Sequence, residues 1–209
     1  MKRWGSMAMS SLLAVTTAGG AARADEPEER PWKATINAYL YVVPDQDNFV
    51  MLTAPVDIRW FHVEARYNYE ALRSGSAFAG IHVGWGEALK LKVTPMIGGV
   101  FGALDGLVPA LRWTLTWWKL DLYSESEVVV DFDDTSDSFF YDWSELGFTP
   151  LDWLRFGAAI QRTRVLMTSL DFQRGLFVAA TIRFVTVSLY EFNLGWATPT
   201  WVGAVSATF

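Results

Sequence analysis

The chain has 209 residues, of which 51% are hydrophobic and 15% aromatic, and its net charge at neutral pH is −6. A chain of this length forms one domain, and an acidic chain without a basic cluster is a poor candidate for binding nucleic acid. It contains no cysteine, which excludes the disulfide bonds that often hold small secreted domains together.

The first 24 residues have the features of a secretory signal peptide. Lys2 and Arg3 give a basic start, residues 7–18 are uncharged and mostly apolar, and Ala22-Arg23-Ala24 fits a cleavage site between small residues. We therefore expect cleavage before Asp25, which takes the net charge from −6 to −9, and a periplasmic N-terminal segment over residues 25–31. Beyond the signal, no window has the ~20 uninterrupted apolar residues that a spanning helix needs.

From residue 32 onward, apolar and polar residues alternate with a period of two, which is typical of strands that have lipid on one face and a lumen on the other. Segment 61–71 is the clearest, because Val63 and Ala65 share one face while Glu64 and Arg66 share the other. Twelve strands are predicted, at about 32–43, 48–58, 61–71, 77–86, 88–99, 107–118, 119–130, 138–147, 153–164, 174–185, 186–195 and 199–209. Proline occurs inside three of these segments, so ten or eight strands remain as alternatives.

The predicted connections alternate between longer and shorter ones. Longer polar or Gly-containing segments include 44–47, 72–76, 102–106, 131–137 and 165–173, whereas the others are tight, apart from Phe148–Asp152. Bacterial barrels have long extracellular loops and short periplasmic turns, so both termini are expected on the periplasmic side.

Tryptophan supports the same orientation. Six tryptophans lie at the predicted periplasmic ends of strands: Trp32, Trp60, Trp85, Trp117, Trp118 and Trp153. Indole rings favour the interface between water and lipid, so we expect these residues to form a girdle.

The chain ends on an amphipathic segment with an aromatic last residue. In residues 199–209, Trp201, Val205 and Ala207 share a face with Phe209. Together with the signal peptide, this ending resembles the C-terminal signature of bacterial outer-membrane β-barrels. The resemblance implies an all-β, transmembrane, antiparallel up-and-down barrel over residues 32–209, located in the outer membrane. It also implies contact with outer-membrane lipids and recognition of Phe209 by the barrel-assembly machinery, and it leaves the oligomeric state open.

Charged residues occur on the face expected to line the lumen, where inward charges pair or face water. The candidate lumen-lining residues are His62, Glu64, Arg66, Lys90, Lys92, Arg112, Arg155 and Arg183. Both positively and negatively charged residues occur, and the carboxylates partly offset the positive charge of the basic stripe.

The sequence gives weak support for catalysis or for metal binding. The two histidines, His62 and His82, have no inward serine beside them and lie in the expected periplasmic half, so we expect no catalytic residues and no cofactor. An acidic stretch with Asp131, Asp133, Asp134 and Asp137 is a weak Ca²⁺ candidate, because it lacks the glycine and final glutamate of an EF-hand.

Three functional hypotheses remain. The first is a narrow channel for small solutes or anions, since twelve-stranded members of this class include narrow porins for acidic oligosaccharides. The second is a non-conducting structural or adhesive barrel whose loops make the contacts. The third, a lipid-modifying enzyme, is less well supported because no Ser–His pair is expected at the outer rim.

Overall fold

The computed structural model describes residues 31–44, 47–165, 171–195 and 197–209, so the predicted signal peptide and its cleavage site lie outside the described residues. Antiparallel strands dominate the described chain, and none of its helices is long and apolar enough to cross a membrane. The elements are β1 (Trp32–Val42), β2 (Phe49–Ile58), β3 (Phe61–Tyr67), β4 (Ser74–Ile81), β5 (Val83–Trp85), β6 (Leu89–Gly102), β7 (Gly106–Trp117), β8 (Leu120–Asp131), the 3-10 helix η1 (Thr135–Asp137), β9 (Phe139–Leu151), β10 (Leu154–Val165), β11 (Asp171–Ile182), β12 (Val185–Phe192) and β13 (Thr200–Thr208).

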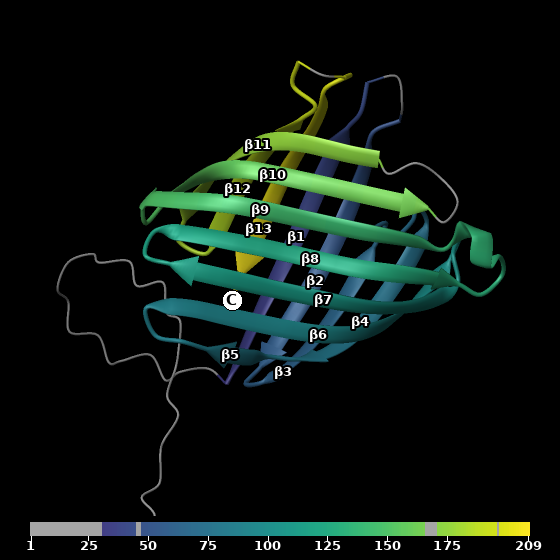
Figure 1. Cartoon of the computed structure of the whole chain (residues 1–209), viewed down its shortest axis with the longest axis horizontal. Helices are drawn as coiled ribbons and strands as arrows, with labels where there is room; N and C mark the ends of the chain where they lie inside the picture. The colour runs from purple at the N-terminus through teal and green to yellow at the C-terminus, as the bar shows by residue number, and fades with distance from the viewer. Residues whose placement is uncertain (1–30, 45–46, 166–170, 196) are drawn as a thin grey trace, which may run out of the picture.

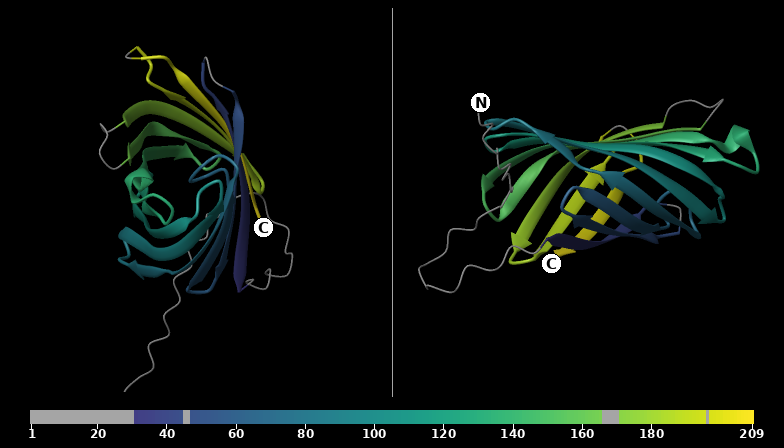
Figure 2. Two further views of the ribbon diagram at one scale, coloured as in Figure 1. Left: turned by 90° about the vertical axis from the view of Figure 1, so that its right-hand side faces the viewer. Right: turned by 90° about the horizontal axis from the view of Figure 1, so that it is seen from below.

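Strand pairing closes the sheet into a barrel (Figures 1 and 2). β1 pairs with β2 on one side and with β13 on the other. β4 and β5 both pair with β6, so they form one wall strand that is interrupted at His82. The wall therefore has twelve strands, which confirms the predicted number and excludes ten or eight.

The strand boundaries depart from the prediction at several places. β3 ends at Tyr67, four residues early, because Asn68 turns the chain with a φ of 56°. β9 continues to Leu151, so the connection predicted to be longer at Phe148–Asp152 is in fact a tight turn. Next to that turn, β9 and β10 shift register between Leu154 and Phe156, which accommodates Pro150 near the end of β9.

The outer face of the barrel is apolar over most of its area. In β1, Ile36 and Leu40 are exposed, whereas Tyr41 is buried inside, as the alternation predicts. All six tryptophans of the predicted girdle are exposed and lie at the same end of the barrel. The exposed apolar band is the surface that lipid would cover.

The two ends of the barrel have different connections. At the girdle end, each connection has two or three residues, and Arg59, Trp118 and Arg183 adopt positive φ in these tight turns. At the other end, most connections have five to seven residues, including the one that carries η1. The structure thus confirms that the short connections share one end, and the assignment of that end to the periplasm stays a prediction from the general pattern of such barrels.

Candidate functional site

Two apolar clusters narrow the interior at the end that has the long connections. One involves β1, β2 and β9–β13 and includes Tyr41, Trp143 and Phe192. The other involves β4, β6, β7 and β8 and includes Phe78 and Val108. Aromatic side chains therefore occupy much of the space that a twelve-stranded wall would otherwise leave open.

A buried ionic network centred on Arg66 lies between these clusters. Arg66 in β3 donates hydrogen bonds to Glu125 at 2.6 Å, Glu127 at 2.9 Å, Glu64 at 3.1 Å and Glu70 at 3.5 Å. β3 and β8 are separated along the wall by β4, β6 and β7, so the bonds to Glu125 and Glu127 cross the interior. A complete set of carboxylate partners is what makes a fully buried guanidinium tolerable.

Two more arginines form ion pairs at the edge of the open space. Arg112 in β7 donates to Glu64 at 2.7 Å and to Glu125 at 2.6 Å, and Arg155 in β10 donates to Glu145 at 2.6 Å and also to Asp121. The Arg112 side chain is 20% exposed, against 2–3% for its two partners. Arg155 is likewise more exposed than either of its partners. In each of these ion pairs the guanidinium group is thus the more exposed partner, although the carboxylates line the same space.

The open part of the interior is a cavity of about 560 Å³. It extends from Thr116 and Thr149, near the short turns, to Tyr141 and Trp143 at the edge of the apolar cluster. We call this space the vestibule. Threonine, tyrosine and charged side chains line it, and the tyrosine rings together with Met51, Pro55 and Trp143 give it a largely apolar surface.

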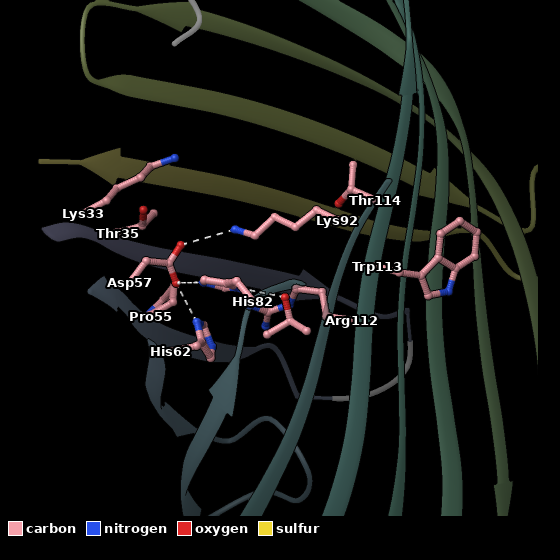
Figure 3. A pocket seen from close by; sticks show the side chains of 11 residues that line it. Lys33, Thr35, Pro55, Asp57, His62, His82, Lys92, Arg112, Trp113 and Thr114 are labelled. Atoms are coloured by element: carbon pink, nitrogen blue, oxygen red, sulfur yellow. Dashed lines mark hydrogen bonds and ion pairs between the residues drawn. The ribbon is translucent and has the colours of Figure 1, made fainter. Parts of the chain in front are cut away.

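A smaller cavity of about 120 Å³ adjoins Asp57, His62, His82 and Lys92 (Figure 3). Oδ1 of Asp57 lies 2.6 Å from Nδ1 of His62 and 2.8 Å from Nε2 of His82. Nζ of Lys92 lies 3.6 Å from the other oxygen of the same carboxylate. Both histidines, which are far apart in the sequence, thus share one aspartate.

This cluster has ligand types that suit a metal ion, since Asp57, His62 and His82 each place one ligand atom within 4.8 Å of the others. The surroundings oppose a cation, because Lys33, Lys92 and Arg112 line the same cavity and repel positive charge. The histidines find partners without a metal. Besides Asp57, His62 contacts Glu64 at 3.1 Å, and His82 contacts Thr94 at 2.8 Å. We therefore interpret the cluster as part of the charged lumen wall.

The remaining basic residues of the predicted lumen have different surroundings. Lys90 is exposed on β6, on the same face as Lys92, and its cross-strand neighbour Thr116 lines the vestibule. Arg183 lies in the turn between β11 and β12, because β11 ends at Ile182. The structure thus places Arg183 at the end of the barrel and not along a strand that faces the lumen.

The carboxylates of the acidic connection hold that connection in shape. Asp131 accepts hydrogen bonds from the backbone N–H groups of Asp133 at 2.7 Å and Asp134 at 3.1 Å. Asp134 caps η1 by accepting bonds from the backbone and hydroxyl of Ser136, and these bonds lower the pKa of the Asp134 carboxyl. Asp137 lies within η1. The carboxylates of Asp131 and Asp134 thus have partners within the connection itself.

Several residues of the interior network were absent from the predicted lumen set. Glu125 and Glu127 hold Arg66, and Glu145 accepts bonds from Arg155, Trp143 and other groups. A sequence signal for the first two existed, because Asp121, Glu125 and Glu127 are spaced by even numbers of residues and therefore share one face of β8.

No protein-family model and no curated protein sequence matches the chain. Solved structures do match. The KdgM porin has a TM-score of 0.60 at 10% identity, over 84% of this chain and 99% of that one. The KdgM porin in complex with disordered oligogalacturonate has a TM-score of 0.63 at 10% identity and the same coverage. The Acinetobacter baumannii outer membrane protein Omp33 has a TM-score of 0.50 at 11% identity, over 86% of this chain and 97% of that one.

At these identities the likeness concerns the fold. The protein is a closed, antiparallel outer-membrane β-barrel, which confirms the predicted class. An apolar outer band on a closed wall suits a lipid bilayer, because every backbone group is paired and no edge is exposed. The fold and this outer surface are those of a protein that spans the outer membrane.

Proposed function

We propose that the protein is a narrow outer-membrane channel for small solutes, with a mild preference for anions. The observation that carries this proposal is the relative exposure of basic and acidic groups around the vestibule and the smaller cavity beside it. At Arg112, Arg155 and Lys92, the basic group is more exposed than each carboxylate that it contacts. Charged groups at the surface of a pore set its selectivity.

The likeness in fold is compatible with this proposal. One structure of the KdgM porin contains an oligogalacturonate, which is an acidic sugar chain. From this comparison we take only the expectation that the solute is negatively charged, because the vestibule of the present protein has its own arrangement of side chains. Neither the interior contacts nor the porin-like fold gives reason to propose an enzymatic reaction.

The apolar clusters define the main competing hypothesis. Tyr41, Trp143, Tyr190 and Phe192 pack together beyond the vestibule, and a permanent closure at this level would make a non-conducting structural barrel. A channel requires a passage between this cluster and the Arg66 network. Conductance therefore separates the two hypotheses directly.

The test is a planar-bilayer measurement with the purified protein, including the reversal potential in a salt gradient. We expect small, anion-preferring conductance. The double variant Lys90→Gln/Lys92→Gln should lower the anion preference while leaving assembly intact, because lumen positions do not contact lipid. The matched control, Arg59→Gln/Arg183→Gln, removes two charges from the turns and should retain the preference. Cation selectivity would contradict the proposed preference, and absence of conductance would favour the structural barrel.

A further inference from the structure

One region of the outer face is polar. Along each described strand, alternate side chains point away from the lumen. Among these outward-pointing side chains, charged ones occur only on β9–β12 of the described strands. A compact group on β8–β11 forms what we call the outer polar patch, and it consists of Ser124, Ser126, Asp142, Ser144, Arg162 and Arg174.

The alternation along the strands establishes that this patch faces outward. In β8, Glu125 and Glu127 join the interior network, so Ser124 and Ser126 point the other way. In β9, Trp143 and Glu145 face the vestibule. Asp142 therefore lies on the outside, together with the exposed Leu146. Cross-strand register places Asp142 beside Ser126 on β8 and beside Arg162 on β10.

Asp142 is the centre of the patch and is only 1% exposed. It accepts hydrogen bonds from Ser124 at 3.1 Å, Ser126 at 2.6 Å and Ser144 at 3.0 Å. Arg162 completes the set through Nε at 3.1 Å and Nη2 at 2.8 Å, yet its side chain remains 40% exposed. The carboxylate is thus covered, and the group presented to the membrane is the guanidinium.

A second arginine lies next to Arg162. Ile160 pairs with Arg174 and Arg162 pairs with Phe172, so the two arginines are diagonal neighbours on β10 and β11. Arg174 is exposed, and its guanidinium lies 5.3 Å from the centre of the Phe172 ring. Glu191 on β12 is diagonal to Arg174 and partly offsets its charge. Positive charge is still the most exposed charge of the patch.

The depth of the arginines suggests their partner. Arg162 lies three residues before the end of β10, and Arg174 three residues after the start of β11, at the end that has the long connections (Figure 1). At a rise of ~3.3 Å per residue and a tilt of ~40°, they lie about 8 Å below the strand ends. Long basic side chains at this depth reach toward lipid headgroups.

We propose that the outer polar patch binds a phosphate group of a lipid in the outer leaflet. Guanidinium groups match phosphate oxygens in charge and geometry. Asp142 is a positioning residue here, since its two bonds to Arg162 hold the guanidinium against the wall. Exposed charge on the lipid face is unfavourable, and a bound phosphate would add a partner for the part of Arg162 that Asp142 leaves exposed.

The test uses the folded protein in mixed micelles that contain either bisphosphorylated lipid A or the same lipid without phosphates. Native mass spectrometry measures the bound lipid at each concentration. We expect at least tenfold tighter binding of the phosphorylated lipid. The variant Arg162→Gln/Arg174→Gln should lose about that factor, and Arg162→Lys/Arg174→Lys should retain part of it. The control Arg59→Gln/Arg183→Gln, at the opposite end of the barrel, should bind like the wild type.

Equal binding of the two lipids, or an unchanged affinity in the Gln variant, would overturn the proposal. Displacement of the lipid by an equal concentration of inorganic phosphate would also overturn it, since that result indicates a site for free anions. If the patch instead joins two copies of the chain, the wild type will form dimers in detergent that the Gln variant lacks. Folding of each variant is checked by its migration on a gel with and without heating.

Discussion

Replacement of Arg66 by methionine should strongly destabilise the barrel. The Arg66 side chain is fully buried and contacts Glu64, Glu125, Glu127 and Glu70. Methionine approximates the volume of the stem but removes the only positive charge shared by these four carboxylates. The variant would then hold several acidic groups in the barrel interior with reduced compensation.

The expected loss in free energy of unfolding is about 3–5 kcal/mol, the usual cost of removing one partner from a buried ion pair. Contacts with aromatic rings add to it, because the Arg66 guanidinium carbon lies 4.1 Å from the centre of the Phe78 ring and 4.3 Å from that of Tyr69. Such contacts contribute about 0.5–2 kcal/mol each. Urea unfolding of the protein in lipid vesicles, followed by tryptophan fluorescence, measures the total.

Two further variants make the reasoning testable. Arg66→Met/Glu127→Gln should recover part of the lost stability, because Oε1 of Glu127 has no hydrogen-bond partner among the described residues and an amide at this position cannot bring a negative charge into the interior. Arg183→Met, in an exposed turn, should change stability by less than about 0.5 kcal/mol. A loss below about 1 kcal/mol for Arg66→Met, or no recovery in the double variant, would refute the inference that the Arg66 network stabilises the barrel.

Three other results are expected. Deletion of Phe209 should reduce the yield of folded barrel in cells, because its backbone pairs with the first strand; an unchanged yield would count against this role. An epitope tag inserted in Asp131–Asp137 should be accessible on intact cells, and one at Trp118-Lys119 should not; the reverse pattern would invert the orientation. Gly157→Ala should destabilise the barrel by about 1–3 kcal/mol in the same urea assay, because the added carbon would overlap the carbonyl oxygen of Leu146, and a stable variant would contradict that clash.

The sequence was sufficient for the number of strands and for most of their faces. A period of two is enforced wherever lipid covers one face, so the faces of β1 and β3 can be assigned from the sequence alone. The limits of the strands were less predictable, because the turn at Asn68 depends on a single left-handed residue. Arg183 was misplaced for the same kind of reason, since the turn comes two residues earlier than expected.

Contacts across the interior could not be predicted from alternation. The pattern states that Arg66 and Glu125 face inward, but it does not state that side chains from β3 and β8 meet. The pattern also fails locally in β9, where Asp142, Trp143, Ser144 and Glu145 are all polar or amphipathic. Neither face is distinctly apolar there, and this is where the outer polar patch lies.

Closure of the wall by β1 and β13 has a consequence for the protein before it is folded. Thr35 pairs with Thr208, and Val42 pairs with Trp201, so the final seam joins opposite ends of the barrel sequence. Until that seam forms, two strands retain unpaired edges that can pair with other chains. Pairing over such a long separation is slow, which prolongs the exposure. The period of greatest risk of aggregation is thus the interval before β1 and β13 pair, and a chaperone that covers these two edges would protect the chain during it.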